Sequence, residues 1–188
     1  MGNKLQTLFQ SFSSGPQRRI LLLGLDAAGK TTITYEMKDD TLVQTIPTVG
    51  FNCEEISIPK AKINFVVWDV GGQEKLRALW KHYYTQASGL FFVVDCSDRK
   101  RLEIAREELF TTLNDNQMVG VPLIILANKQ DIPSAASPDE IISLFRLKEV
   151  SDRPWKVVPT CAVRKEGLLE AFTLMATYSK DFAKKNKK

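Results

Sequence analysis

The sequence predicts an α/β fold: a mostly parallel sheet with helices on both faces. Three observations support this. Short apolar runs rich in Ile, Val, Leu and Phe alternate with stretches of helical spacing. The first run leads into a glycine-rich loop followed by a helix-compatible stretch. Two runs between residues 51 and 69 are separated only by a short turn, which predicts one antiparallel pair. The 188 residues correspond to about one domain.

The expected strands are continuous apolar runs, which are typical of a sheet covered on both faces. They are residues 20–25, 63–69, 89–95, 121–127 and 155–160, with one further strand before a turn at 59–62. Two later stretches show helical spacing of apolar residues. Their apolar members are Leu102, Ala105, Leu109 and Leu113, and then Leu168, Phe172, Met175 and Phe182. We interpret both stripes as core-facing sides of helices.

Composition excludes several classes of protein. With 44% hydrophobic and 26% charged residues, the chain is neither collagen-like, disordered nor a coiled coil. No apolar run approaches the ~18 residues that a membrane-spanning helix needs. The three cysteines are scattered and lack a CxxC pair, so the sequence indicates neither a disulfide framework nor a zinc site, and it favours a reducing, intracellular compartment.

The glycine-rich loop fits the pattern G-x-x-x-x-G-K-[ST] between a strand and a helix. Small residues let successive backbone N–H groups turn toward phosphate oxygens at a helix N-terminus. We expect Lys30 to reach the β- and γ-phosphates and Thr31 to ligate Mg²⁺. The expected phosphate-binding residues of this loop are Gly24, Leu25, Asp26, Ala27, Ala28, Gly29, Lys30, Thr31 and Thr32.

Two further loops are expected to sense the γ-phosphate. The strand at 63–69 ends in Asp69, which is suited to hold Mg²⁺ through water, and then continues into a Gly-Gly-Gln sequence. There the Gly72 amide can donate to a γ-phosphate oxygen and Gln73 can orient the attacking water. Upstream, Thr48 lies in a polar loop and can close over Mg²⁺ and the γ-phosphate.

Base recognition is expected after the strand at 121–127, at Asn128, Lys129 and Asp131. A carboxylate at Asp131 can accept both N1–H and N2–H₂ of guanine, a donor pair that adenine lacks, which argues against a P-loop ATPase or nucleotide kinase. Lys129 can lie along the ring, and Asn128 can tie neighbouring loops together. The loop with Cys161 and Ala162 can offer a backbone N–H to the guanine carbonyl oxygen.

The charged residues beyond Gln73 receive no chemical role. We interpret Arg77 and Lys81 as solvated or effector-facing charges, and His82 as a surface or packing residue. No arginine is evidently aimed at the γ-phosphate, so intrinsic hydrolysis should be slow. An activating protein that supplies an arginine can accelerate such a reaction by roughly 10³ to 10⁵. We therefore expect a GTPase-activating protein and a guanine-nucleotide exchange factor as partners.

Together the motifs GLDAAGKT, PTVGFN, WDVGGQEK, NKQD and TCA, in this order and spacing, resemble those of the ADP-ribosylation factor (Arf) and Arf-like small GTPases, over nearly the whole chain. The resemblance implies the small G-protein fold of P-loop NTPases, with a six-stranded, mostly parallel sheet. It also implies a monomeric GTP/GDP switch acting in vesicle traffic or in membrane and cytoskeleton organisation. Phe51, Trp68 and Tyr83 match the family's effector-binding patch. The basic C-terminus is similar to that of certain Arf-like members.

Both ends of the chain are expected to serve membrane attachment. Residues 1–17 form an expected amphipathic helix and linker, whose apolar residues are Leu5, Leu8, Phe9 and Phe12. Gly2 is a candidate for myristoylation, although Gln6 replaces the usual Ser or Thr. The GTPase domain then spans 18–179, and 180–188 form a basic tail with five Lys and one Asp. By the resemblance, the helix docks in the GDP form and is released with GTP.

These features place the protein in the cytoplasm, reversibly bound to Golgi, endosomal or plasma membrane, with no nucleic-acid partner. One alternative function stays open. The chain could be a nucleotide-gated adaptor with negligible GTP turnover, acting purely as a binding module.

Overall fold

The computed structural model describes residues 16–38, 48 and 50–186. The expected N-terminal helix with Gly2, and the last two residues of the expected basic tail, lie outside this range. Among the described residues, no helix is both long enough and apolar enough to cross a lipid bilayer.

Six strands form one sheet in the described part of the chain, as predicted. They are β1 (Gln17–Leu23), β2 (Phe51–Ile58), β3 (Ile63–Val70), β4 (Gly89–Asp95), β5 (Leu123–Asn128) and β6 (Trp155–Pro159), in the order β2-β3-β1-β4-β5-β6. Only β2 and β3 pair antiparallel, across the expected turn; the other neighbours are parallel. Of the strands that follow β1 in the chain, β2 and β3 lie on one side of it, and β4, β5 and β6 lie on the other. The strand order therefore reverses between β1 and β4. Ligands of such sheets bind beyond the carboxyl ends at this point.

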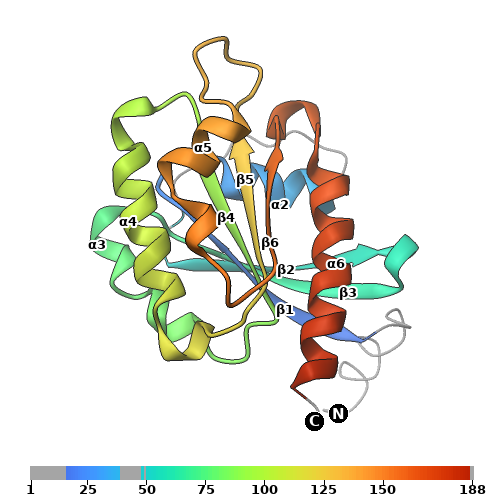
Figure 1. The fold of residues 1–188 in the computed structure, drawn as a ribbon. Helices are drawn as coiled ribbons and strands as arrows, with labels where there is room; N and C mark the ends of the chain where they lie inside the picture. The colour runs from blue at the N-terminus through green and yellow to red at the C-terminus, as the bar shows by residue number, and fades with distance from the viewer. Residues whose placement is uncertain (1–15, 39–47, 49, 187–188) are drawn as a thin grey trace.

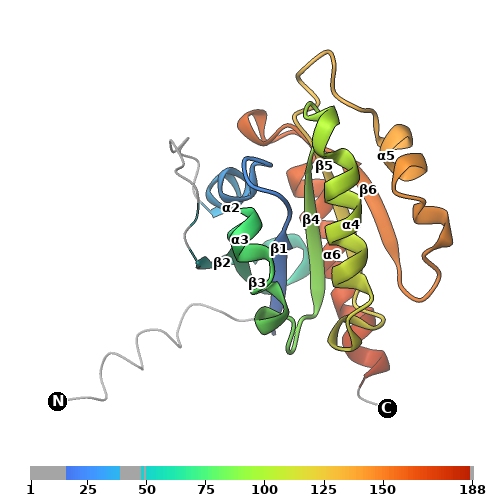
Figure 2. The ribbon, with the colours of Figure 1, turned by 90° about the vertical axis from the view of Figure 1, so that its left-hand side faces the viewer.

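Helices cover both faces of the sheet. They are α2 (Lys30–Lys38), α3 (Glu74–Arg77), α4 (Leu102–Leu113), α5 (Pro138–Leu144) and α6 (Leu168–Lys185). Short 3₁₀ turns lie at Pro59–Ala61, Trp80–Tyr83, Arg99–Arg101, Asn116–Met118, Leu147–Glu149 and Ala162–Arg164. Figures 1 and 2 show α4 and α6 on opposite sides of the strands. The mostly parallel sheet with flanking helices is the predicted fold class.

Alternate residues of the buried strands supply two hydrophobic clusters, one on each face. Leu21 and Leu23 of β1 pack with α4 and α5, whereas Ile20 and Leu22 pack with α2 and α6. The two predicted apolar stripes occupy these clusters: the α4 stripe is buried, and the α6 stripe is buried apart from Phe182, which is partly buried. The helix α6 continues to Lys185, so the expected basic tail begins as helix, and the Lys180 ammonium donates to the Ala61 carbonyl.

Truncating Phe172 should cost about 3–5 kcal/mol of unfolding free energy. This ring is fully buried, and its centroid stacks 4.6 Å from that of Phe91. Denaturant unfolding of Phe172→Ala in saturating GDP measures the loss. Leu169→Ala, at a side chain that is 55% exposed on the same helix, is the control and should stay within about 0.5 kcal/mol of wild type. Equal losses in the two variants would contradict the assigned core.

Candidate functional site

A glycine-rich loop joins β1 to α2, and its backbone conformation requires glycine. Gly24 has φ +143°, and a Cβ there would lie 2.2 Å from the Val93 carbonyl oxygen. Gly29, at φ +100°, precedes Lys30, the first residue of α2. The buried Lys30 Nζ donates to the carbonyl oxygens of Gly24 (2.9 Å) and Leu25 (2.8 Å). A helix N-terminus with a fixed ammonium beside it is an anion-binding arrangement.

Three oxygen-bearing side chains meet at the start of α2. The Thr31 hydroxyl donates to Asp69 Oδ2 at 2.6 Å and lies 3.0 Å from the Thr48 hydroxyl, which is itself 3.5 Å from Asp69 Oδ2. Asp69 is fully buried, and its Oδ1 has no hydrogen-bond partner within the described structure. Burial raises the pKa of Asp69, although the Thr31 hydroxyl and the charge of Lys30 oppose the shift.

This donor set fits a hard divalent cation. Two hydroxyls and one buried carboxylate offer only oxygen, and Mg²⁺ prefers few protein ligands together with phosphate oxygens and water. In the described ranges no group of three or more His, Cys, Asp or Glu side chains could hold a metal. Thr31, Thr48 and Asp69, the predicted Mg²⁺ residues, are therefore the candidate ligands, directly or through water.

The two glycines before Gln73 lie against two other loops. A Cβ at Gly71 would come within 2.7 Å of the Thr48 carbonyl oxygen, and one at Gly72 within 2.3 Å of the Gly24 carbonyl oxygen. Backbone hydrogen bonds join the same segments, from Gly71 N–H to Gly50 O (2.9 Å) and from Asp26 N–H to Gly72 O (3.1 Å). The loops predicted to sense the γ-phosphate thus both adjoin the phosphate loop.

A cavity of about 390 Å³ lies between these loops. All the residues that line it are predicted site residues: Asp26, Ala27, Gly29, Lys30, Thr31, Thr32, Thr48, Gly72, Gln73 and Lys129. The volume is in the range of small-molecule and cofactor sites. Gln73 lies at its exposed rim, as the residue that precedes α3.

Asn128, which precedes the cavity-lining Lys129, ties three loops together. Its Nδ2 donates to the Ala28 carbonyl oxygen at 2.9 Å, and its Oδ1 accepts from the Ala162 N–H (3.0 Å) and the Thr160 hydroxyl (3.3 Å). The side chain is buried. Asn128 therefore has the contacts that the sequence led us to expect of it.

The other predicted base-binding residues lie around Asn128. Asp131 is exposed, and its Oδ1 accepts from the Cys161 thiol at 3.2 Å. Burial, followed by this carboxylate, raises the pKa of the thiol. Lys129 pairs with Asp95 Oδ2 at 2.6 Å, a partner that the sequence did not suggest. Partial burial acts to raise the pKa of Asp95, but hydrogen bonds from Lys129 and Ser97 outweigh it and lower the pKa.

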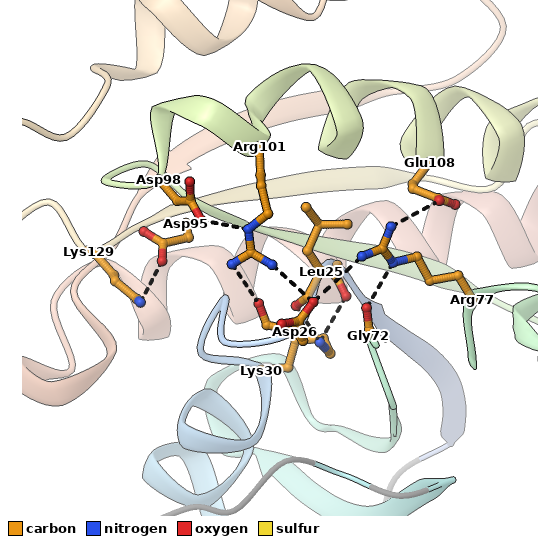
Figure 3. A network of polar contacts seen from close by, with 11 residues as sticks. Leu25, Asp26, Lys30, Gly72, Arg77, Asp95, Asp98, Arg101, Glu108 and Lys129 are labelled. Atoms are coloured by element: carbon orange, nitrogen blue, oxygen red, sulfur yellow. Dashed lines mark hydrogen bonds and ion pairs between the residues drawn. The ribbon is translucent and has the colours of Figure 1, made fainter. Parts of the chain in front are cut away.

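The prediction that Arg77 is a solvated or effector-facing charge is wrong. Its side chain is only 10% exposed, and its Nε donates to the Gly72 carbonyl oxygen at 2.9 Å. Its guanidinium also pairs with Asp26 (3.6 Å) and Glu108 (3.3 Å). Figure 3 shows Arg77 and Arg101 approaching Asp26 from opposite sides. No sequence pattern indicated that either arginine pairs with Asp26, because Asp26 lies far from both along the chain. Lys81 and His82 are exposed.

The three predicted effector-binding aromatics form one cluster. The Phe51 ring centroid lies 5.0 Å from that of Trp68 and 5.4 Å from that of Tyr83. Phe51 is 45% exposed although it is a large apolar residue. The Arg19 guanidinium lies 3.9 Å from the Trp68 ring centroid and donates to the Tyr83 carbonyl oxygen, so it contacts two members of the cluster.

Comparison with known proteins agrees with this geometry. The family model of the ADP-ribosylation factor family matches residues 4–179. The solved structure of the Arl6 (BBS3) small GTPase from Trypanosoma brucei, with the bound nucleotide analogue GppNp, matches with a TM-score of 0.79. The two sequences are 29% identical, and the match covers 88% of this chain and 98% of that one.

Thr31→Asn should weaken Mg²⁺ and GTP binding by roughly 10–100-fold while sparing GDP. The hydroxyl that contacts Asp69 and Thr48 is lost, and GTP depends more on the cation than GDP does. Titration with a fluorescent nucleotide, with and without Mg²⁺, measures the change. Thr177→Asn, at an exposed threonine of α6, is the control. Unchanged GTP affinity in Thr31→Asn would remove Thr31 from the metal site.

Nucleotide binding should become coupled to proton uptake above about pH 8. Burial lowers the pKa of Lys30 to about 8, and phosphate oxygens favour the protonated amine. Below this pH the ammonium is already present, so the Kd for GDP should be constant. Above it the Kd should rise, by up to about tenfold per pH unit. Titrations between about pH 7 and pH 9 test this, and Lys30→Gln should bind weakly with no such slope. A flat profile in wild type would contradict the assignment.

Proposed function

Because this chain belongs to the ADP-ribosylation factor family of small GTPases, we propose that it hydrolyses GTP to GDP and, in its GTP form, recruits effectors to membranes. The observation that carries the proposal is the shared cavity, which Thr48, Gly72 and Gln73 line from two loops beside the phosphate loop. A γ-phosphate bound there would contact both loops, and loss of that phosphate would free both.

Each end of the cavity has a distinct task in the proposed reaction. Backbone N–H groups of the phosphate loop and the Lys30 ammonium would hold the phosphates, although in this structure the Asp26 N–H donates to the Gly72 carbonyl oxygen. Thr31, Thr48 and Asp69 would hold Mg²⁺, which neutralises charge on the β- and γ-phosphate oxygens. Gln73 orients the attacking water. Asp131 would accept the N1–H and N2–H₂ donors of guanine, and Lys129 would lie along the ring. The loop of Cys161 and Ala162 would lie beside the guanine carbonyl oxygen, but in this structure the Cys161 N–H donates to Glu166 O and the Ala162 N–H to Asn128 Oδ1.

The same loops connect the cavity to the aromatic cluster. Gly71 donates to Gly50, the residue before β2, and Gly71 itself follows β3. Phe51 and Trp68 lie on these two strands, next to one another. A shift of the loops on γ-phosphate loss would therefore move the rings. We propose that effectors bind Phe51, Trp68 and Tyr83 and so distinguish the GTP form from the GDP form.

Turnover and exchange are proposed to need protein partners. Within the described residues, Arg77 and Arg101 pair with Asp26 and do not line the cavity. A GTPase-activating protein that supplies a guanidinium would then speed hydrolysis, and an exchange factor would release GDP. The same observation favours the second candidate, an adaptor with negligible turnover. If no Arf-directed activating protein stimulates hydrolysis, the adaptor function is favoured.

Membrane recruitment is proposed from the two ends of the chain. The apolar face of residues 1–17, a myristoyl group on Gly2 and the lysines of 180–188 would act together, since one acyl chain gives only marginal binding. We propose a monomeric protein of the cytoplasm that binds Golgi, endosomal or plasma membranes in vesicle traffic or in membrane and cytoskeleton organisation. Mass spectrometry of the native N-terminus and liposome sedimentation with GDP and GTP test this; sedimentation independent of the nucleotide would contradict it.

Gln73→Leu should hold the protein in its GTP form. The leucine side chain fits the rim of the cavity but cannot orient water, so single-turnover hydrolysis should fall by about tenfold or more. The measurement is phosphate release from protein loaded with GTP. Glu74→Gln, at the next exposed residue, is the control and should keep the wild-type rate. An unaltered rate in Gln73→Leu would contradict the role assigned to Gln73.

A further inference from the structure

The carbonyl of Gly72 accepts two hydrogen bonds, one from the phosphate loop and one from α3. The Asp26 N–H, from the phosphate loop, donates at 3.1 Å, and the Arg77 Nε, from the end of α3, donates at 2.9 Å. The preceding carbonyl, of Gly71, accepts from the buried Trp80 indole at 2.9 Å. Both peptides immediately before Gln73 are therefore fixed by side chains that follow Gln73 in the chain (Figure 3 shows the Gly72 contact).

Arg77 also joins this loop to two other elements. Its guanidinium lies 3.6 Å from Asp26 Oδ1 in the phosphate loop and 3.3 Å from Glu108 Oε1 in α4. The Arg77 side chain is only 10% exposed. Its planar guanidinium has several N–H donors and can therefore contact one carbonyl and two carboxylates at the same time. Removing it would leave the Gly72 carbonyl with one donor and would remove the ion pair between Arg77 and Glu108 of α4.

Arg101 provides an internal comparison. It pairs with the same carboxylate, Asp26, at 3.0 Å, and its Nε donates to Asp98 at 2.6 Å. Within the described part of the chain, its hydrogen bonds to the phosphate loop go to the carboxylate and the carbonyl oxygen of Asp26, and none goes to Gly72. The two arginines thus share a partner but differ in the contact with the peptide that precedes Gln73.

We propose that Arg77 is a positioning residue for GTP hydrolysis: it fixes the Gly72 peptide against the phosphate loop and thereby places Gln73 at the cavity. Arg77 does not line the cavity, so it acts through Gly72 and makes no contact with the nucleotide. Near the same segment, the Thr48 hydroxyl lies 3.0 Å from that of Thr31 and 3.5 Å from Asp69 Oδ2, so the residues proposed to meet Mg²⁺ and the γ-phosphate are close to one another. This inference rests on the proposed function, because it assigns a role in that reaction.

Arg77→Ala tests the proposal. Single-turnover hydrolysis of preloaded GTP should fall about tenfold or more, the effect of losing one buried charge-assisted hydrogen bond. The Kd for GDP should change by less than about twofold, because the diphosphate needs neither Gly72 nor Gln73. Arg77→Lys should restore little, because an ammonium cannot reproduce the fork. Arg101→Ala should lower the rate less than Arg77→Ala. Arg106→Ala, at a partly exposed residue of α4 that pairs with Glu103, is the neutral control.

The outcomes separate positioning from a general structural role. Equal loss of GDP and GTP affinity in Arg77→Ala, together with a lower thermal midpoint in GDP, would overturn the proposal. An equal fall in rate for Arg101→Ala would overturn it as well, since the charge of Asp26 would then be the cause. If wild type shows no hydrolysis, the enzymatic function fails. The affinity for GppNp relative to GDP then decides on Arg77: a lower ratio in Arg77→Ala supports positioning of Gly72, and an unchanged ratio overturns it.

Discussion

The close approach of the Gly71–Gly72 backbone to two neighbouring loops is the constraint on which the site depends. A Cβ at Gly72 would meet the carbonyl of Gly24, and one at Gly71 would meet that of Thr48. Both of these carbonyl oxygens belong to the backbone, so they cannot move away by a change of rotamer as a side-chain atom can. Glycine at both positions therefore lets three loops share one cavity wall, and none of the three can be displaced far without disturbing the others.

The parallel sheet brings these loops to one edge. β1, β3 and β5 run parallel within the sheet, so the residues that follow them emerge on the same side. Apolar side chains cover these strands on both faces, so the loops that follow them extend from a buried sheet. Lys30, Asp69 and Asn128 lie at or after the ends of these strands and come to the same edge, although each is tens of residues from the next along the chain. The function of the chain as a GTPase-family switch depends on this convergence.

Features that depend on residue spacing along the chain could be predicted from the sequence, whereas contacts between side chains distant in sequence could not. Strand ends, the glycine loop and the convergence of Thr31, Thr48 and Asp69 follow from motifs and topology. The burial of Arg77 could not be predicted. An arginine in a polar stretch gives the same sequence pattern whether it faces solvent or, as here, pairs with Asp26 and Glu108. The pair of Lys129 with Asp95 and the support of Trp68 by Arg19 also join separate strands or loops. The helical start of the lysine-rich end depends on contacts such as that of Lys180 with Ala61.

The buried amide of Asn128 joins its own set of loops, separate from those that meet at Gly71 and Gly72. Its bonds to Ala28, Thr160 and Ala162 involve neither Thr48 nor the Gly72 segment. Under the proposed function, the base site around Asn128 would therefore bind GDP and GTP alike. Discrimination between the two nucleotides would depend on the loops of Thr48 and Gly72, so selectivity for the base and the response to the γ-phosphate could be altered independently.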